Sequence, residues 1–97
     1  MKHTLEKNKL TIYLEGELNS SNSEEAEKEI ENIVNKNKFQ SLALDFDNLR
    51  YISSAGLRII ASLKQRFDDI TLVKVPQSVY EIFSMVGFQN IVKIETK

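Results

Sequence analysis

Residues 47–65, DNLRYISSAGLRIIASLKQ, join a predicted strand to a predicted helix through two adjacent serines. The segment before them, KFQSLALDF (residues 38–46), has apolar side chains at every second position, which is typical of a strand with a buried face. After the serines, apolar residues recur at helical spacing, which predicts a helix that ends near Phe67. These residues are Leu57, Ile60, Ala61 and Leu63. The segment therefore reads as a strand–turn–helix unit.

The sequence on both sides continues the alternation of strands and helices. Asn8 suits a turn between two strands, Pro76 can open a helix, and Gly87 can close that helix. The remaining strands are predicted at residues 5–18 (as a pair), 70–75 and 90–94, and the remaining helices at residues 23–37 and 76–86. The order β-β-α-β-α-β-α-β predicts an α/β fold of one domain, residues 1–97, with a mixed, mostly parallel sheet packed with helices.

Local features are expected to shape the ends of these elements. Ser21 and Glu24 fit a capping box at the start of the first helix. Gly16 is expected to interrupt the second strand, and Asn48 is expected to form a turn ahead of the serine pair. The first helix is strongly charged (SEEAEKEIENIVNKNK, residues 23–38), and we interpret its charges as a solvated face.

Composition argues against several classes of function. Thirteen basic residues against fourteen acidic ones leave a net charge of −1, whereas nucleic-acid binders concentrate positive charge. The chain has no cysteine and only one histidine, His3, so neither a metal site of thiolates or imidazoles nor a Ser-His-Asp triad is expected. We therefore expect a protein without enzymatic activity, without a cofactor or metal, and without a nucleic-acid partner.

No segment is expected to enter a membrane. The longest uncharged run, residues 82–92, is too short and too polar for a spanning helix, which needs about 20 apolar residues. The N-terminal sequence MKHTLEKNKL carries charges where a signal peptide would be apolar. We expect a cytoplasmic protein, and its modest apolar content favours a monomer.

Four uses of the serine pair are open on the residues alone. A serine before a helix is a preferred N-cap, and Gly56 would let the first turn approach the sheet closely. A serine nucleophile would need a base, and the only histidine, His3, lies far away in the sequence. A phosphate-binding loop usually has more glycines and a lysine, whereas SSAGLR offers one glycine and Arg58. The fourth use is that a serine accepts a phosphoryl group from a kinase.

Three segments resemble the signature regions of the STAS domain, which occurs in bacterial anti-sigma factor antagonists and in sulphate-transporter tails. They are LEGELNSSNSEEAEKEIENIV (residues 14–34), SLALDFDNLRYISSAGLRII (residues 41–60) and VPQSVYEIFSMVGFQNIV (residues 75–92), of which the middle one is the most specific. In the antagonists the phosphorylated serine lies two residues before the glycine, which corresponds to Ser54 here. Ser53 stands where many members carry aspartate, and Ala55 stands where many carry serine or threonine.

The resemblance implies a function by partner switching. The unmodified protein would bind an anti-sigma factor, which is a serine kinase with the histidine-kinase-like ATPase fold, and would be released once that kinase phosphorylates Ser54. A metal-dependent phosphatase of the PP2C type would reverse the modification. The implied partner contacts besides Ser54 are Ser53, Ala55, Gly56, Arg58 and Asn19.

Two of the polar residues outside the serine pair also have counterparts in the family. Asn19 closes the segment GELN (residues 16–19), which resembles the family's Gly-x-Leu-Asp, so it is expected beside Ser54. A role for Asn19 as a turn residue at the helix entry is equally open. Asp45 resembles the aspartate at the end of the family's third strand. A purely structural role for Asp45, in which it holds the following turn, is also open.

Other functions remain open at this point. The chain could be a STAS scaffold, or an accessory subunit docked to a membrane transporter, that is never phosphorylated. It could also bind a nucleotide or a lipid.

Overall fold

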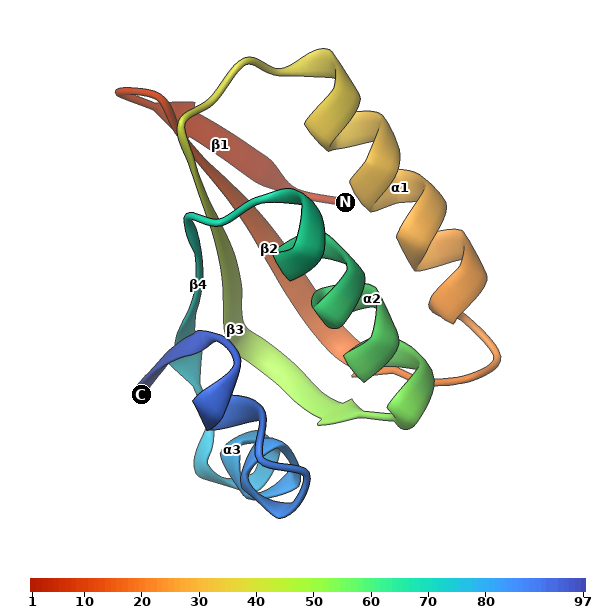
Figure 1. The fold of residues 1–97 in the computed structure, drawn as a ribbon. Coiled ribbons are helices and arrows are strands. Elements are labelled where there is room, and N and C mark those ends of the chain that lie inside the picture. Colours follow the sequence, from red (N-terminus) through yellow and green to blue (C-terminus); the bar gives the residue numbers. More distant parts are fainter.

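Five strands and three helices alternate along the chain in the computed structural model, which describes all of residues 1–97 (Figure 1). The strands are β1 (His3–Glu6), β2 (Lys9–Leu18), β3 (Ser41–Ile52), β4 (Ile70–Val75) and β5 (Lys93–Thr96). The helices are α1 (Ser23–Lys36), α2 (Ser54–Arg66) and α3 (Gln77–Met85), and a short 3-10 turn, η1, covers Phe88–Asn90. None of the helices is long and apolar enough to cross a membrane. The element order confirms the predicted α/β fold.

The strands form one sheet in which they lie in chain order, β1-β2-β3-β4-β5. β1 and β2 are antiparallel and are joined by a tight turn in which Lys7 and Asn8 have φ angles of 49° and 69°. The other three pairs are parallel, and a helix crosses over within each connection. The mixed, mostly parallel sheet and the turn at Asn8 therefore agree with the prediction.

β3 lies at the centre of the sheet and of the core. Its residues from Leu42 to Phe46 are all buried, as expected for a strand that is covered on both faces. Figure 1 shows α1 and α2 side by side along the sheet, with their first turns at the same end of the molecule. α3 packs against β3 and η1 through aromatic rings. The centroid of the Phe83 ring lies 5.6 Å from that of Phe46 and 5.5 Å from that of Phe88.

β3 runs further than predicted, and the expected turn at Asn48 is wrong. The strand continues because its second half pairs with the end of β2, up to the pair formed by Leu18 and Ile52. Gly16 interrupts the regular pairing of β2, as expected, but does not end the strand. It has a φ angle of 75°, and the pairing shifts register between Tyr13 and Glu15 and again between Gly16 and Glu17, so the strand bends and goes on.

α1 begins at Ser23 without the predicted capping box. Its N-cap is Asn22, whose side chain makes no cap hydrogen bond to the helix. The Ser21 hydroxyl donates to Oδ1 of Asn19 at 2.7 Å. The capping-box prediction is therefore wrong, because Asn19 engages the hydroxyl that was expected to cap the helix.

The last strand starts later than predicted. Of the predicted residues 90–94, Asn90 belongs to η1, where the Phe88 ring stacks on Phe83, and β5 begins only at Lys93. Gly87 lies just beyond the end of α3 with a φ angle of 74°, as expected for the glycine that stops a helix.

Candidate functional site

The serine pair follows directly on the common end of β2 and β3. Leu18 and Ile52 are the last paired residues of the two strands. The amide of Ser53 then donates to the carbonyl of Leu18 at 2.8 Å, which adds one more hydrogen bond to the pairing. Because the chain turns into α2 at the next residue, the sheet itself fixes where the two serines lie.

Ser53 is the N-cap of α2. Its backbone is extended, with φ −93° and ψ 175°, and its Oγ accepts a hydrogen bond from the amide of Gly56 at 3.4 Å. Its carbonyl accepts from the amide of Leu57 at 3.0 Å, which is the first turn of the helix. Of the two serines, Ser53 is therefore the one that caps the helix.

Gly56 is buried where the first turn of α2 rests on the ends of both strands. A Cβ at this position would lie 2.6 Å from Cγ1 of Ile52 and 2.9 Å from Cγ of Leu18. Such distances are much shorter than a normal carbon–carbon contact of about 3.5–4.0 Å. Only glycine lets the helix lie this close to the sheet.

Ser54 is the first residue of α2, and its side chain is exposed. Its hydroxyl is not needed for the cap, because Ser53 supplies the capping oxygen. Ala55 is half-buried beside it, and Arg58, one helical turn further along, is exposed. The two adjacent serines thus differ, since one holds the helix and the other faces solvent.

A hollow of about 220 Å³ adjoins this first turn. Its walls are Ala55, Arg58 and Ile59 from α2, and Ser23, Glu24 and Glu27 from α1. The part played by Glu24 and Glu27 was missed from the sequence, where the charges of α1 read as a solvated face. Their spacing in the sequence places them on one side of a helix. Only the packing of α1 beside α2 shows that they line the same hollow as Arg58.

Asn19 lies in the connection from β2 to α1 and is half-buried. Its Oδ1 accepts from the amide of Ser21 at 3.0 Å and from the amide of Asn22 at 3.2 Å. The backbone amide of Asn19 donates to Oδ1 of Asn22 at 2.9 Å. The side chain of Asn19 is therefore hydrogen-bonded within its own loop. The hydrogen bond that joins this segment to the serine pair is the one that the carbonyl of Leu18 accepts from the amide of Ser53.

Asp45 is the only buried charged residue, and it lies within β3 rather than at its end. Its Oδ1 accepts from the amide of Asp47 at 2.9 Å, and Nζ of Lys74 lies 3.9 Å from its Oδ2. Asp47 pairs with Lys97 at 2.9 Å, and this hydrogen bond holds the pKa of the Asp47 carboxyl below its usual range. The first ion pair links β3 to β4, and the second links β3 to the C-terminal residue.

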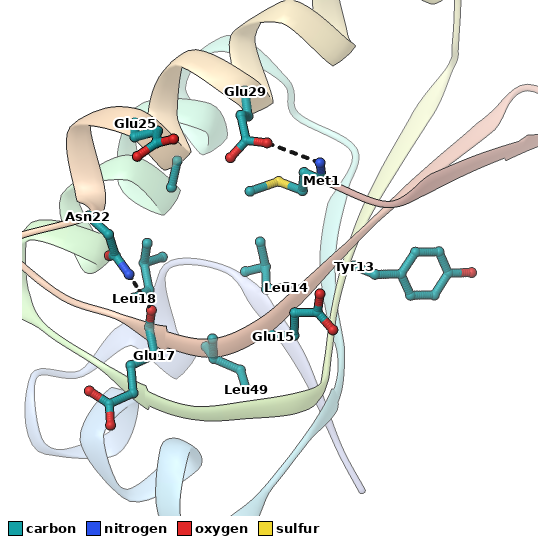
Figure 2. A pocket seen from close by; sticks show the side chains of 11 residues that line it. Met1, Tyr13, Leu14, Glu15, Glu17, Leu18, Asn22, Glu25, Glu29 and Leu49 are labelled. Carbon is teal, nitrogen blue, oxygen red and sulfur yellow. Dashed lines mark hydrogen bonds and ion pairs between the residues drawn. The ribbon is translucent and has the colours of Figure 1, made fainter.

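A larger hollow of about 370 Å³ lies between β2 and α1 (Figure 2). Figure 2 shows Leu14 and Leu18 pointing from β2 toward α1, while the ammonium group of Met1 pairs with Glu29 at 3.0 Å. Four carboxylates are among its lining residues, namely Glu15, Glu17, Glu25 and Glu29. This charge opposes the phosphates of a nucleotide, so the hollow does not favour the nucleotide-binding alternative.

Comparison with known sequences places the whole chain in one family. The sequence profile of the STAS domain matches residues 2–97. The chain is 36% identical over 97 residues to BtrV of Bordetella bronchiseptica, a protein named as an anti-sigma factor antagonist. That match covers 94% of this chain and 83% of BtrV.

Solved structures of two proteins share the fold. TM1081 of Thermotoga maritima, described as an anti-sigma factor antagonist, gives a TM-score of 0.87 at 20% identity over 99% of this chain and 86% of that chain. SpoIIAA of Bacillus gives 0.73 at 17% identity in its unphosphorylated form and 0.64 at 16% in its phosphorylated form. Those matches cover 99% of this chain and 90% and 93% of the SpoIIAA chains. The profile match and the identity to BtrV establish that this chain belongs to the STAS domain family.

Proposed function

We propose that this chain is an anti-sigma factor antagonist that works by partner switching, with Ser54 as the residue that is phosphorylated. The relative BtrV is named as an anti-sigma factor antagonist. The observation that carries the proposal is the division of roles between the serines: Ser53 caps α2, and Ser54 is exposed and free for an enzyme.

The fold has a physical reason to tolerate a phosphate on Ser54. A phosphoryl group adds a charge of about −1.5 to −2. Ser54 is the first residue of α2, where the positive end of the helix dipole stabilises an anion by about 0.3–1 kcal/mol. Phosphorylation would therefore leave the domain folded.

A partner pressed against the same turn would not tolerate the phosphate. The proposed contact residues are Ser53, Ala55, Gly56 and Arg58, with Asn19 at the margin. Burying a charge without a counter-charge costs about 3–5 kcal/mol, and each 1.4 kcal/mol weakens binding about tenfold. A modification that is harmless to the fold thus abolishes the complex.

The antagonist itself performs no chemistry in this scheme. The anti-sigma factor kinase binds ATP, and Oγ of Ser54 forms a bond to the γ-phosphorus while the bond to the bridging oxygen of ADP breaks. The hydroxyl proton passes to a base of the kinase. A metal-dependent phosphatase of the PP2C type later hydrolyses the ester and restores the hydroxyl. We propose that this cycle runs in the cytoplasm with the antagonist as a monomer and with no cofactor of its own.

The test is to incubate the protein with ATP, magnesium and the anti-sigma factor kinase from the same organism, and then to measure the intact mass of the protein. The wild type and Ser53→Ala should each gain one phosphoryl group, and Ser54→Ala should gain none. Ser53→Ala is the matched control, because it removes the neighbouring hydroxyl and leaves the acceptor in place. A Ser54→Ala protein that is modified as fast as the wild type would reject the proposal.

The rival proposal is a STAS scaffold or transporter subunit that is never phosphorylated. It predicts that the wild type keeps its mass in the same reaction and co-purifies with a transporter ATPase from native cells.

A further inference from the structure

Arg58 lies four residues after Ser54 on α2, and both side chains are exposed. Residues at this spacing are neighbours on the surface of a helix. Because helical side chains lean toward the N-terminus, the long side chain of Arg58 can reach back along the helix to Ser54. The proposed phosphorylation site therefore has a cation within one turn of the same helix.

Arg58 has no partner of its own in the folded chain. Arg66, at the other end of α2, pairs with Glu31 of α1. The other ion pairs involve the N-terminal ammonium group and the lysines 74, 93 and 97, and none of them includes Arg58. Its guanidinium is thus free to take a new anionic partner.

Arg58 is the only cation among the residues that line the hollow at the first turn of α2. The hollow between the first turns of α1 and α2, which lie side by side in Figure 1, is lined by Glu24 and Glu27 and by no lysine or other arginine. Both carboxylates would repel a phosphate on Ser54. Among the side chains that line this hollow, Arg58 is therefore the only one that would attract a phosphate.

We infer that Arg58 binds the phosphate of phospho-Ser54 within the same chain. The inference rests on the proposed function only for the identity of the modified residue. An anion at position i with a cation at i+4 is the favourable order on a helix, and the planar guanidinium matches the oxygens of a phosphate. Phosphorylation then changes the contact surface twice, because it adds negative charge and also withdraws Arg58 from a partner.

The experiment uses the full chain with phosphoserine incorporated at position 54 during synthesis, so that no kinase is needed. The second pKa of the phosphate, ordinarily about 6, is measured by ³¹P NMR titration. A cation beside the phosphate favours the dianion and lowers this pKa. Arg58→Gln should therefore raise it by about 0.2–0.4, the size expected for an exposed pair at this spacing.

The matched control is Arg66→Gln, which removes the same charge from the far end of α2 and should leave the phosphate pKa unchanged. The effect of Arg58→Gln should also shrink at about 1 M salt, where the screening length is about 3 Å. An Arg58→Gln protein with the wild-type pKa, or an equal shift in Arg66→Gln, would overturn the inference. Neither result bears on whether a kinase modifies Ser54, so this test and that of the proposed function fail independently.

Discussion

Gly56 lies against Ile52 so closely that a Cβ on the glycine would come within 2.6 Å of Cγ1 of the isoleucine. Ile52 is the last residue of β3, and Gly56 is in the first turn of α2. This contact joins the strand to the helix across the serine pair. We expect both the stability of the domain and the position of Ser54 to depend on this contact.

Gly56→Ala should destabilise the domain and impair phosphorylation of Ser54. The added methyl group meets Ile52 and Leu18 inside the core, and overpacking of this kind costs about 1–3 kcal/mol. If the helix moves outward to relieve the contact, Ser54 moves with it. Chemical denaturation gives the free energy of unfolding, and the rate of phosphoryl transfer by the kinase shows whether Ser54 is still accessible in the right position.

Gly16→Ala is the control for that substitution. Gly16 has a φ angle of 75° and no atom within 4 Å of the added Cβ, so the cost is backbone strain of about 1–2 kcal/mol without a clash. This variant should lose stability and still be phosphorylated at the wild-type rate. Equal phosphorylation of Gly56→Ala and Gly16→Ala would contradict the link between this contact and the site.

The two serines should differ in their contribution to stability. Ser53→Ala removes the capping oxygen that accepts from the Gly56 amide, and loss of an N-cap costs about 0.5–2 kcal/mol. Ser54→Ala changes an exposed side chain and should alter the free energy of unfolding by no more than about 0.5 kcal/mol. Urea denaturation of the two variants checks this order, and a larger loss in Ser54→Ala would reverse the assignment of roles.

Ser54→Asp should leave the melting temperature nearly unchanged while weakening binding to the anti-sigma factor by about tenfold or more. The carboxylate is tolerated at the start of α2 but not at a protein interface. Ser54→Asn is the matched control, because it has the same shape without the charge and should bind more tightly than Ser54→Asp. Scanning calorimetry gives the melting temperature, and titration calorimetry gives the affinity for the anti-sigma factor. A domain that unfolds with Asp at this position would contradict the expectation that the start of α2 tolerates a negative charge.

The pair between Asp47 and Lys97 should make a contribution to stability that depends on pH. Lys97 holds the pKa of Asp47 below its usual value of about 3.9, so the folded state favours the charged form. The stabilisation is therefore complete above about pH 4 and is lost as the pH falls through the folded-state pKa. Lys97→Gln should raise the Asp47 pKa in NMR titration, and its stability should approach that of the wild type only in acid.

Lys93→Gln is the control for this pair. It removes one positive charge from β5, but Lys93 contacts Glu95 and not Asp47. An Asp47 pKa that rises as much in Lys93→Gln as in Lys97→Gln would show that net charge, not the specific hydrogen bond, sets the value.

Much of the fold was predictable because its periodicity is simple. Leu10, Ile12 and Leu14 alternate in β2, and the helices carry stripes at helical spacing. The second half of β3 was not predictable in this way. Leu49 and Ile52 are buried while Arg50 and Tyr51 between them are exposed, a spacing of three where the pairing with β2 changes register. A rule of strict alternation fails at such a bulge.

The candidate site was predictable only in part. The order of residues around Gly56 indicated a serine at a helix start, and the resemblance to the STAS domain selected Ser54. The hollow formed by Glu24, Glu27 and Arg58 depends on how α1 packs beside α2. The local role of Asn19 depends on hydrogen bonds within one loop. Neither feature leaves a periodic signal in the sequence.

Phosphosite mapping on the protein isolated from its native cells, with and without activation of the kinase, tests the central proposal most directly. We expect a single phosphoserine at position 54 whose occupancy rises with kinase activity and falls when the phosphatase acts. A phosphate found on Ser53 instead, or a peptide spanning both serines that stays unmodified while the kinase is active, would contradict it.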